Sequence, residues 1–158
     1  MKVTLKPPIA SDALPLESGA TPRDGFLTEG ELLPTLDVSR GVRRQEVSDF
    51  MLRYTSRFFH IPLDELAENG DLFWLERRIY ALMDGVPIEE AEYGRLGIKK
   101  DGSGGIPDEG FVVWMYLQGI TDAMGLDIAE GGPPEYTVYS LIEFVTEAIA
   151  EAGCLAPS

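Results

Sequence analysis

The chain has 158 residues, with 27 acidic and 13 basic side chains and a formal net charge of −14. This length is typical of one compact domain that buries a substantial core. The negative charge argues against direct binding to nucleic acid or to anionic membranes, because both are bound mainly through lysine and arginine.

Cysteine usage and the absence of targeting signals predict a cytoplasmic protein. Cys154 is the only cysteine, so no internal disulfide can form. The chain begins without a recognisable secretory signal, and its longest apolar run, residues 111–117, is far shorter than the roughly 20 residues of a membrane span.

Residues 1–40 predict an extended N-terminal arm. Five prolines and three glycines interrupt every helical pattern there. Val3 and Leu5 alternate with polar residues, which favours one short edge strand. We expect the arm to lie over its own domain or to reach a neighbouring molecule; a disordered tail is the alternative.

Residues 41–158 predict an all-α, mainly helical domain, a compact bundle of four to five helices. An apolar stripe with the period of an α-helix begins near Gly41 and ends before Pro62. A short second turn follows from Pro62 to Glu68. The stripe consists of Val47, Phe50, Met51, Tyr54 and Phe58, and the arginines Arg43, Arg44, Arg53 and Arg57 lie off it.

The next helix is apolar over much of its circumference. Asp71 suits its N-cap and Gly85 the position after its last turn. From residue 72 to residue 83 the only charged side chains are Glu76, Arg77 and Arg78. A helix with so wide an apolar face is usually central to a bundle.

Three further segments complete the predicted domain. Pro87 opens a short helix that ends at Gly97. Residues 111–124 fit a buried helix or, over their first seven residues, a buried strand, and their length favours the helix. The last helix runs from Pro134 to Gly153. The expected core includes Phe50, Tyr54, Phe58, Leu75, Ile79, Leu82, Val113, Leu117, Leu141, Ile142 and Val145.

The final third of the chain carries acidic side chains and no basic ones. After Lys100 it has ten carboxylates and no lysine, arginine or histidine. Glu143, Glu147 and Glu151 recur every four residues on the last helix, so they form one ridge opposite the apolar stripe, which we call the glutamate ridge. Like charges at this spacing destabilise a helix by roughly 0.2–0.5 kcal/mol per pair. The ridge is either a solvated face or a docking surface.

No motif predicts a catalytic residue, a metal or a cofactor. Residues 24–32 resemble half of a calcium loop, but Ala20 and Pro22 occupy its first two ligand positions. Residues 101–109 lack the final glutamate of such a loop and the lysine of a phosphate-binding loop. His60 is expected at the end of a helix, and Cys154 has no basic neighbour that would activate it.

These observations predict a non-enzymatic interaction or assembly subunit of a larger protein complex, for example a virion or another multi-subunit particle. It would dock through its arm and its charged faces, on a basic partner surface or on the arginines of another copy. The alternative is a soluble acidic inhibitor or immunity-type protein that occludes a basic site on its target. An enzyme with a carboxylate site stays open, although no local pattern singles out a carboxylate pair.

Overall fold

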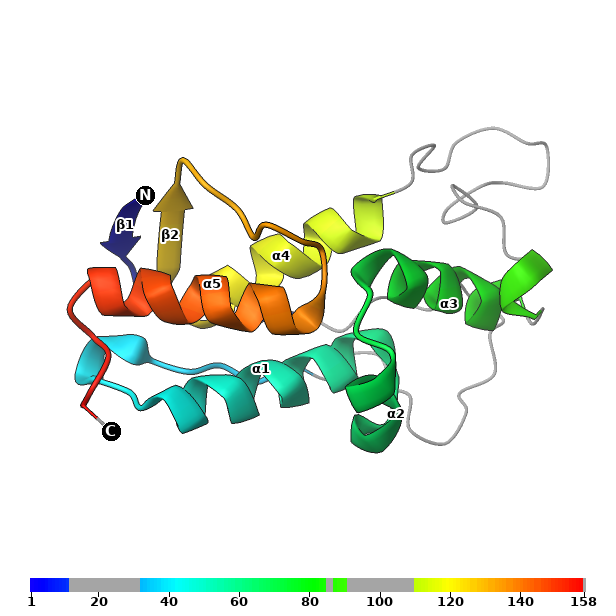
Figure 1. Cartoon of the computed structure of the whole chain (residues 1–158), viewed down its shortest axis with the longest axis horizontal. Coiled ribbons are helices and arrows are strands. Elements are labelled where there is room, and N and C mark those ends of the chain that lie inside the picture. Colours follow the sequence, from blue (N-terminus) through cyan, green and yellow to red (C-terminus); the bar gives the residue numbers. More distant parts are fainter. Residues whose placement is uncertain (12–31, 85–86, 91–109, 158) are drawn as a thin grey trace.

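The computed structural model describes residues 1–11, 32–84, 87–90 and 110–157 (Figure 1). Within these ranges the chain forms five α-helices, two short 3-10 helices and one two-stranded sheet. The predicted mainly helical fold with four to five helices is therefore confirmed. The division of the chain at residue 40 stays a prediction.

Helix α1 (Arg44–Phe59) carries the predicted apolar stripe, all of which is buried. It begins three residues later than Gly41. The reason is that the 3-10 helix η1 (Val38–Arg40) ends at Gly41, whose φ of 87° is left-handed. Val42 then bridges Leu155 in the C-terminal tail, which leaves Arg43 as the N-cap of α1.

Helices α2 (Leu63–Glu68) and α3 (Leu72–Asp84) follow. Asp71 is the N-cap of α3, as predicted. Its Oδ1 accepts a hydrogen bond from the Trp74 backbone N–H at 2.9 Å. Every side chain from residue 72 to residue 82 is buried or half-buried. The helix expected at Pro87 is, in its described part, the 3-10 helix η2 (Ile88–Glu90); Gly85 and residues 91–97 lie outside the described ranges.

Helix α4 (Phe111–Ala123) resolves residues 111–124 in favour of the helix. Gly125, with a φ of 67°, ends it and leads into strand β2 (Leu126–Ala129). Strand β1 (Lys2–Leu5) pairs antiparallel with β2, so the predicted edge strand is confirmed, whereas β2 was not expected. Figure 1 shows the two strands side by side.

The described parts of the predicted arm are held by the helical domain itself. The backbone N–H groups of Lys6 and Ile9 donate to the carbonyls of Gly125 and Asp122, each at 2.9 Å, and Leu36 donates to Ala123 at 3.0 Å. The side chains of two further residues of the arm belong to the core: Leu33 and Val38. Residues 12–31 lie outside the described part of the chain.

Helix α5 (Val138–Glu151) begins four residues later than the predicted Pro134. The residues before it instead tie α5 to α3, because the Tyr136 carbonyl accepts from the Leu72 N–H at 2.9 Å and Asp71 bridges Thr137. Thr137 is the N-cap, and its hydroxyl accepts from the Ser140 N–H at 3.2 Å. Figure 1 shows α5 alongside α1.

The core lies between these helices and contains most of the residues that periodicity selected. All predicted core residues are buried except three, which are half-buried: Leu82, Leu117 and Ile142. The aromatic rings of Tyr54, Phe58 and Tyr116 form its centre, with ring centroids 5.4 to 6.2 Å apart.

Candidate functional site

The glutamate ridge on α5 lies on the surface, as predicted. Glu143, Glu147 and Glu151 are exposed, whereas Leu141, Val145 and other apolar residues of α5 face the core. The ridge begins one turn after Tyr139, which is 51% exposed. Tyr139 and the three carboxylates therefore follow one another at four-residue spacing along the helix.

No cation of the described chain pairs with the ridge. The ion pairs among described residues join Lys6 to Asp122, Arg40 to Asp37 and Arg43 to Glu46, and none involves α5. Glu151 also stands in the last turn of α5, where the helix dipole is negative. The like-charge cost within the helix is therefore left without a compensating contact in the described part of the molecule.

The arginines predicted for partner binding lie on α1 or just before it, and all four are exposed: Arg43, Arg44, Arg53 and Arg57. The Nε–H and the backbone N–H of Arg43 donate to Glu46 Oε1 at 3.1 and 3.3 Å, and these two hydrogen bonds hold the pKa of the Glu46 carboxyl below its usual value. Arg53 Nε reaches the Asp49 carbonyl at 3.4 Å.

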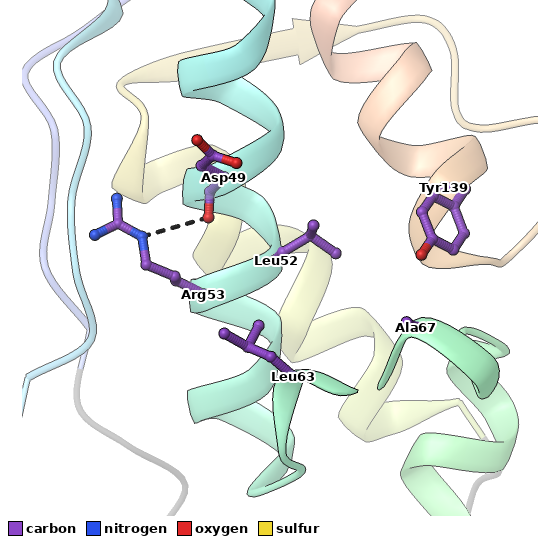
Figure 2. Close-up of a pocket in the computed structure, with 6 residues that line it drawn as sticks. All are labelled: Asp49, Leu52, Arg53, Leu63, Ala67 and Tyr139. Carbon is purple, nitrogen blue, oxygen red and sulfur yellow. Dashed lines mark hydrogen bonds between the residues drawn. The ribbon is translucent and has the colours of Figure 1, made fainter. Parts of the chain in front are cut away.

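The structure does not bring the arginines and the glutamate ridge together. Helices α1 and α5 are in contact, yet none of the ion pairs among described residues joins one of these arginines to the ridge. Figure 2 shows the Arg53 guanidinium on the side of α1 that faces away from Tyr139. The arginines of α1 stand among exposed carboxylates, Glu46 and Asp49, whereas the exposed charged residues of α5 are all glutamates.

A pocket of about 590 Å³ opens between α1, α2 and the start of α5 (Figure 2). Its lining combines apolar side chains with one acid and one base: Asp49, Leu52, Arg53, Leu63, Ala67 and Tyr139. Leu63 and Tyr139 are each 51% exposed. Sequence reasoning missed this pocket, because its residues come from three helices and no local pattern joins them.

The described residues offer no assembled metal site. No group of three His, Cys, Asp or Glu side chains among them lies close enough to hold a metal ion. His60 is buried at the end of α1, where its φ is 53°. Cys154 is also buried. The oxygen-rich segment 101–109 and all but the last residue of segment 24–32 lie outside the described ranges.

Comparisons with protein-family models, with curated protein sequences and with solved structures found no match. Of the helices that the structure describes, none has the length and apolar character that a membrane crossing requires.

Proposed function

We propose that this protein is a non-enzymatic interaction subunit of a larger protein complex and docks through the acidic face of α5. The supporting observation is the glutamate ridge, which is exposed and without a cation partner among the described residues. A basic protein surface would supply the missing charge, and such complementarity accelerates association and fixes orientation. The expected setting is the cytoplasm or a particle assembled there, without direct contact to nucleic acid or membrane.

The second candidate is a soluble acidic inhibitor or immunity-type protein. It is supported by the N-terminal segment, whose described parts stay on their own domain instead of extending from it. An inhibitor needs only a preformed acidic face that covers a basic site on its target. The two candidates differ in the complex formed: an assembly subunit stays in a multi-subunit particle, whereas an inhibitor forms a discrete pair and blocks the activity of its target.

The first experiment isolates the native protein and measures mass by light scattering and composition by mass spectrometry. We expect a particle well above the 17.4 kDa of the single chain, with a partner in fixed stoichiometry or several copies of the chain. A monomer without a partner would reject the assembly proposal and leave the inhibitor, which pairs only with its target.

The second experiment tests the ridge with two triple variants of equal charge change. One carries Glu143→Gln, Glu147→Gln and Glu151→Gln; the control carries Asp127→Asn, Glu130→Gln and Glu135→Gln, which are also exposed. We expect the ridge variant to associate with the partner found in the native complex about tenfold more slowly than the native chain does at low salt. This difference should shrink as salt screens the charges. If both variants slow association equally, net charge and not the position of the ridge controls the rate, which would contradict docking through the ridge.

The contribution of the arm needs a replacement, since deletion of residues 1–38 would remove the buried Leu33 and Val38 and the whole of β1. The Leu33 N–H donates to the Ser11 carbonyl at 2.9 Å, so the two described ends of the arm are adjacent. A short Gly-Ser linker in place of residues 12–31 therefore preserves both ends. Loss of assembly in a stably folded replacement would assign docking to residues 12–31, and unchanged assembly would leave the ridge as the docking surface.

A further inference from the structure

The pocket between α1, α2 and α5 adds a partner chemistry to the proposed function. We propose that it binds a segment of the partner protein in which an aliphatic or aromatic anchor is flanked by lysine or arginine. This inference rests on the proposed function, because it specifies what the acidic face recognises. It is independent of the particular complex in which that recognition takes place.

The floor of the pocket is suited to an apolar anchor. Leu63 and Tyr139 expose half of their surface into solvent, and Leu52 and Ala67 line the space between them. Figure 2 shows these side chains around one opening, with α1 on one side and α2 and α5 on the other. Its volume of about 590 Å³ falls within the range of roughly 300–1,000 Å³ that is typical of ligand pockets.

The three helices that line the pocket carry exposed carboxylates next to its lining residues, against one lining cation, Arg53. Asp64 and Glu68 are exposed and directly follow Leu63 and Ala67 on α2. Glu143 stands one turn after Tyr139 on α5, and Asp49 is part of the lining on α1. None of these four carboxylates takes part in an ion pair with another described residue. A cationic flank on the partner would meet carboxylates contributed by three helices.

The arginines of a second copy fit this pocket less well. Arg43 already pairs with Glu46, and Arg53 hydrogen-bonds the backbone of its own helix. The exposed side chains of α1 between them are all polar or charged: Arg44, Gln45, Glu46 and Asp49. That face therefore offers cations without an apolar anchor. A foreign segment that supplies both features satisfies the floor and the neighbouring carboxylates together.

The test is an NMR titration of the full-length protein, labelled with nitrogen-15, with three synthetic peptides. The first peptide has Leu-Phe between two Lys-Arg pairs; the second has Ser-Ser in place of Leu-Phe; the third has glutamate in place of each cation. We expect only the first peptide to shift the amide signals of Leu52, Leu63, Ala67 and Tyr139. Added salt should weaken its binding, because the carboxylates beside the pocket are exposed.

Two tyrosine variants provide a matched comparison. Tyr139→Ser removes the aromatic side chain from the floor of the pocket and should weaken binding of the first peptide at least about fivefold. Tyr136→Ser changes a residue with nearly equal exposure, 48%, whose ring packs against Phe73 outside the pocket. It should leave the affinity unchanged.

Several results would overturn the assignment of the pocket. These are equal binding of the serine peptide, equal losses in both tyrosine variants, signal shifts on another face, or no binding up to about 1 mM peptide. Self-association that shifts the Arg43 and Arg53 signals would assign the pocket to a second copy instead. A Tyr139→Ser protein that still forms the native complex would reject the pocket while leaving the proposed function intact.

Discussion

Glu76 and Arg78, two residues apart on α3, carry opposite charges and cap two different helices. The buried carboxylate of Glu76 accepts hydrogen bonds from the Gly110 and Val113 N–H groups, at 2.6 and 2.9 Å, at the start of α4. Arg78 Nη1 donates to the Phe59 and His60 carbonyls, both at 3.0 Å, at the end of α1. Each charge meets the end of the helix dipole that it stabilises.

Replacement of the Glu76 carboxylate should destabilise the fold. In Glu76→Gln the side-chain amide would bring an N–H donor against a backbone N–H donor, at a site where Glu76 is fully buried. We expect a loss of about 2 kcal/mol in the free energy of unfolding. Urea unfolding measures it, with Glu89→Gln as a control, since Glu89 is exposed. Equal unfolding midpoints for the two variants would contradict the role of Glu76.

Removal of the Arg78 guanidinium should loosen the end of α1. Arg78 is half-buried, and this burial lowers the pKa of its guanidinium. In Arg78→Met the aliphatic stem is kept while the Phe59 and His60 carbonyls lose their donor. We expect a loss of about 1 to 2 kcal/mol and faster hydrogen exchange in the last turn of α1. The control is Arg53→Met, at an exposed position of α1, which should change stability by less than about 0.5 kcal/mol. A loss as large as that of Arg78→Met would point to a general effect of removing one positive charge.

Local patterns predicted the parts of this molecule that depend on one element at a time. The apolar stripe of α1 and the N-cap at Asp71 are properties of consecutive residues, and the structure confirms both. The exposure of the glutamate ridge is of the same kind, because a four-residue spacing fixes one side of a helix. The wide apolar face of α3 likewise indicated a buried helix.

Features built from distant segments could not be predicted in this way. Strand β2 has four residues and exists through pairing with β1 from the other end of the chain. The three charges on α3 were visible in the sequence, but their partners lie 11 to 37 residues away, at α1, η2 and α4. The pocket beside Tyr139 draws on three helices. Such contacts depend on tertiary packing, which periodicity does not encode.

Position 125, where the N-terminal segment passes close to Gly125, should tolerate no side chain. Gly125 has a φ of 67°, and a Cβ atom there would overlap the Lys6 carbonyl oxygen. We expect Gly125→Ala to cost about 2 kcal/mol or more, because neither backbone can move without breaking the hydrogen bond from the Lys6 N–H to the Gly125 carbonyl. Gly132→Ala is the control, since beyond its chain neighbours no atom of the described residues lies within 4 Å of a Cβ there. Comparable unfolding midpoints in urea would contradict this close contact.

Alkaline pH should unfold the protein through its buried tyrosines. Burial raises the pKa of the Tyr116 and Tyr54 hydroxyls above the usual value of a tyrosine, which is about 10. In the unfolded chain these groups lose their protons near pH 10, whereas the fold retains them. Their contribution to stability is therefore complete below about pH 10 and is lost as the pH rises through the folded-state pKa.

The measurement is the free energy of unfolding between about pH 8 and pH 12 for the native chain and for Tyr116→Phe. At neutral pH the variant should lose about 1 kcal/mol, because the Tyr116 hydroxyl is hydrogen-bonded to Thr55 Oγ1 at 2.6 Å. Above pH 10 its stability should fall less steeply than that of the native chain. Parallel curves for the two proteins would show that Tyr116 does not govern alkaline unfolding.

The packing of α4 on α1 predicts one substitution that is destabilising or stabilising depending on a second residue. Gly119 lies within α4, where alanine normally favours a helix by about 1 kcal/mol. A Cβ at Gly119 would, however, lie 2.5 Å from the hydroxyl oxygen of Tyr54, a fully buried side chain. Gly119→Ala alone should therefore destabilise the fold by about 1 to 3 kcal/mol.

Removal of that hydroxyl should reverse the effect. The Tyr54 hydroxyl makes no hydrogen bond of regular geometry within the described part of the structure, and burial raises its pKa by more than its contact with Ser11 lowers it. Tyr54→Phe alone should therefore cost about 1 kcal/mol or less. The double variant Gly119→Ala/Tyr54→Phe should then recover at least the stability of Tyr54→Phe and gain from the helix propensity of alanine. A double-mutant cycle in urea measures the coupling. Additive losses would contradict it, because they would show that Gly119 and Tyr54 are not in contact.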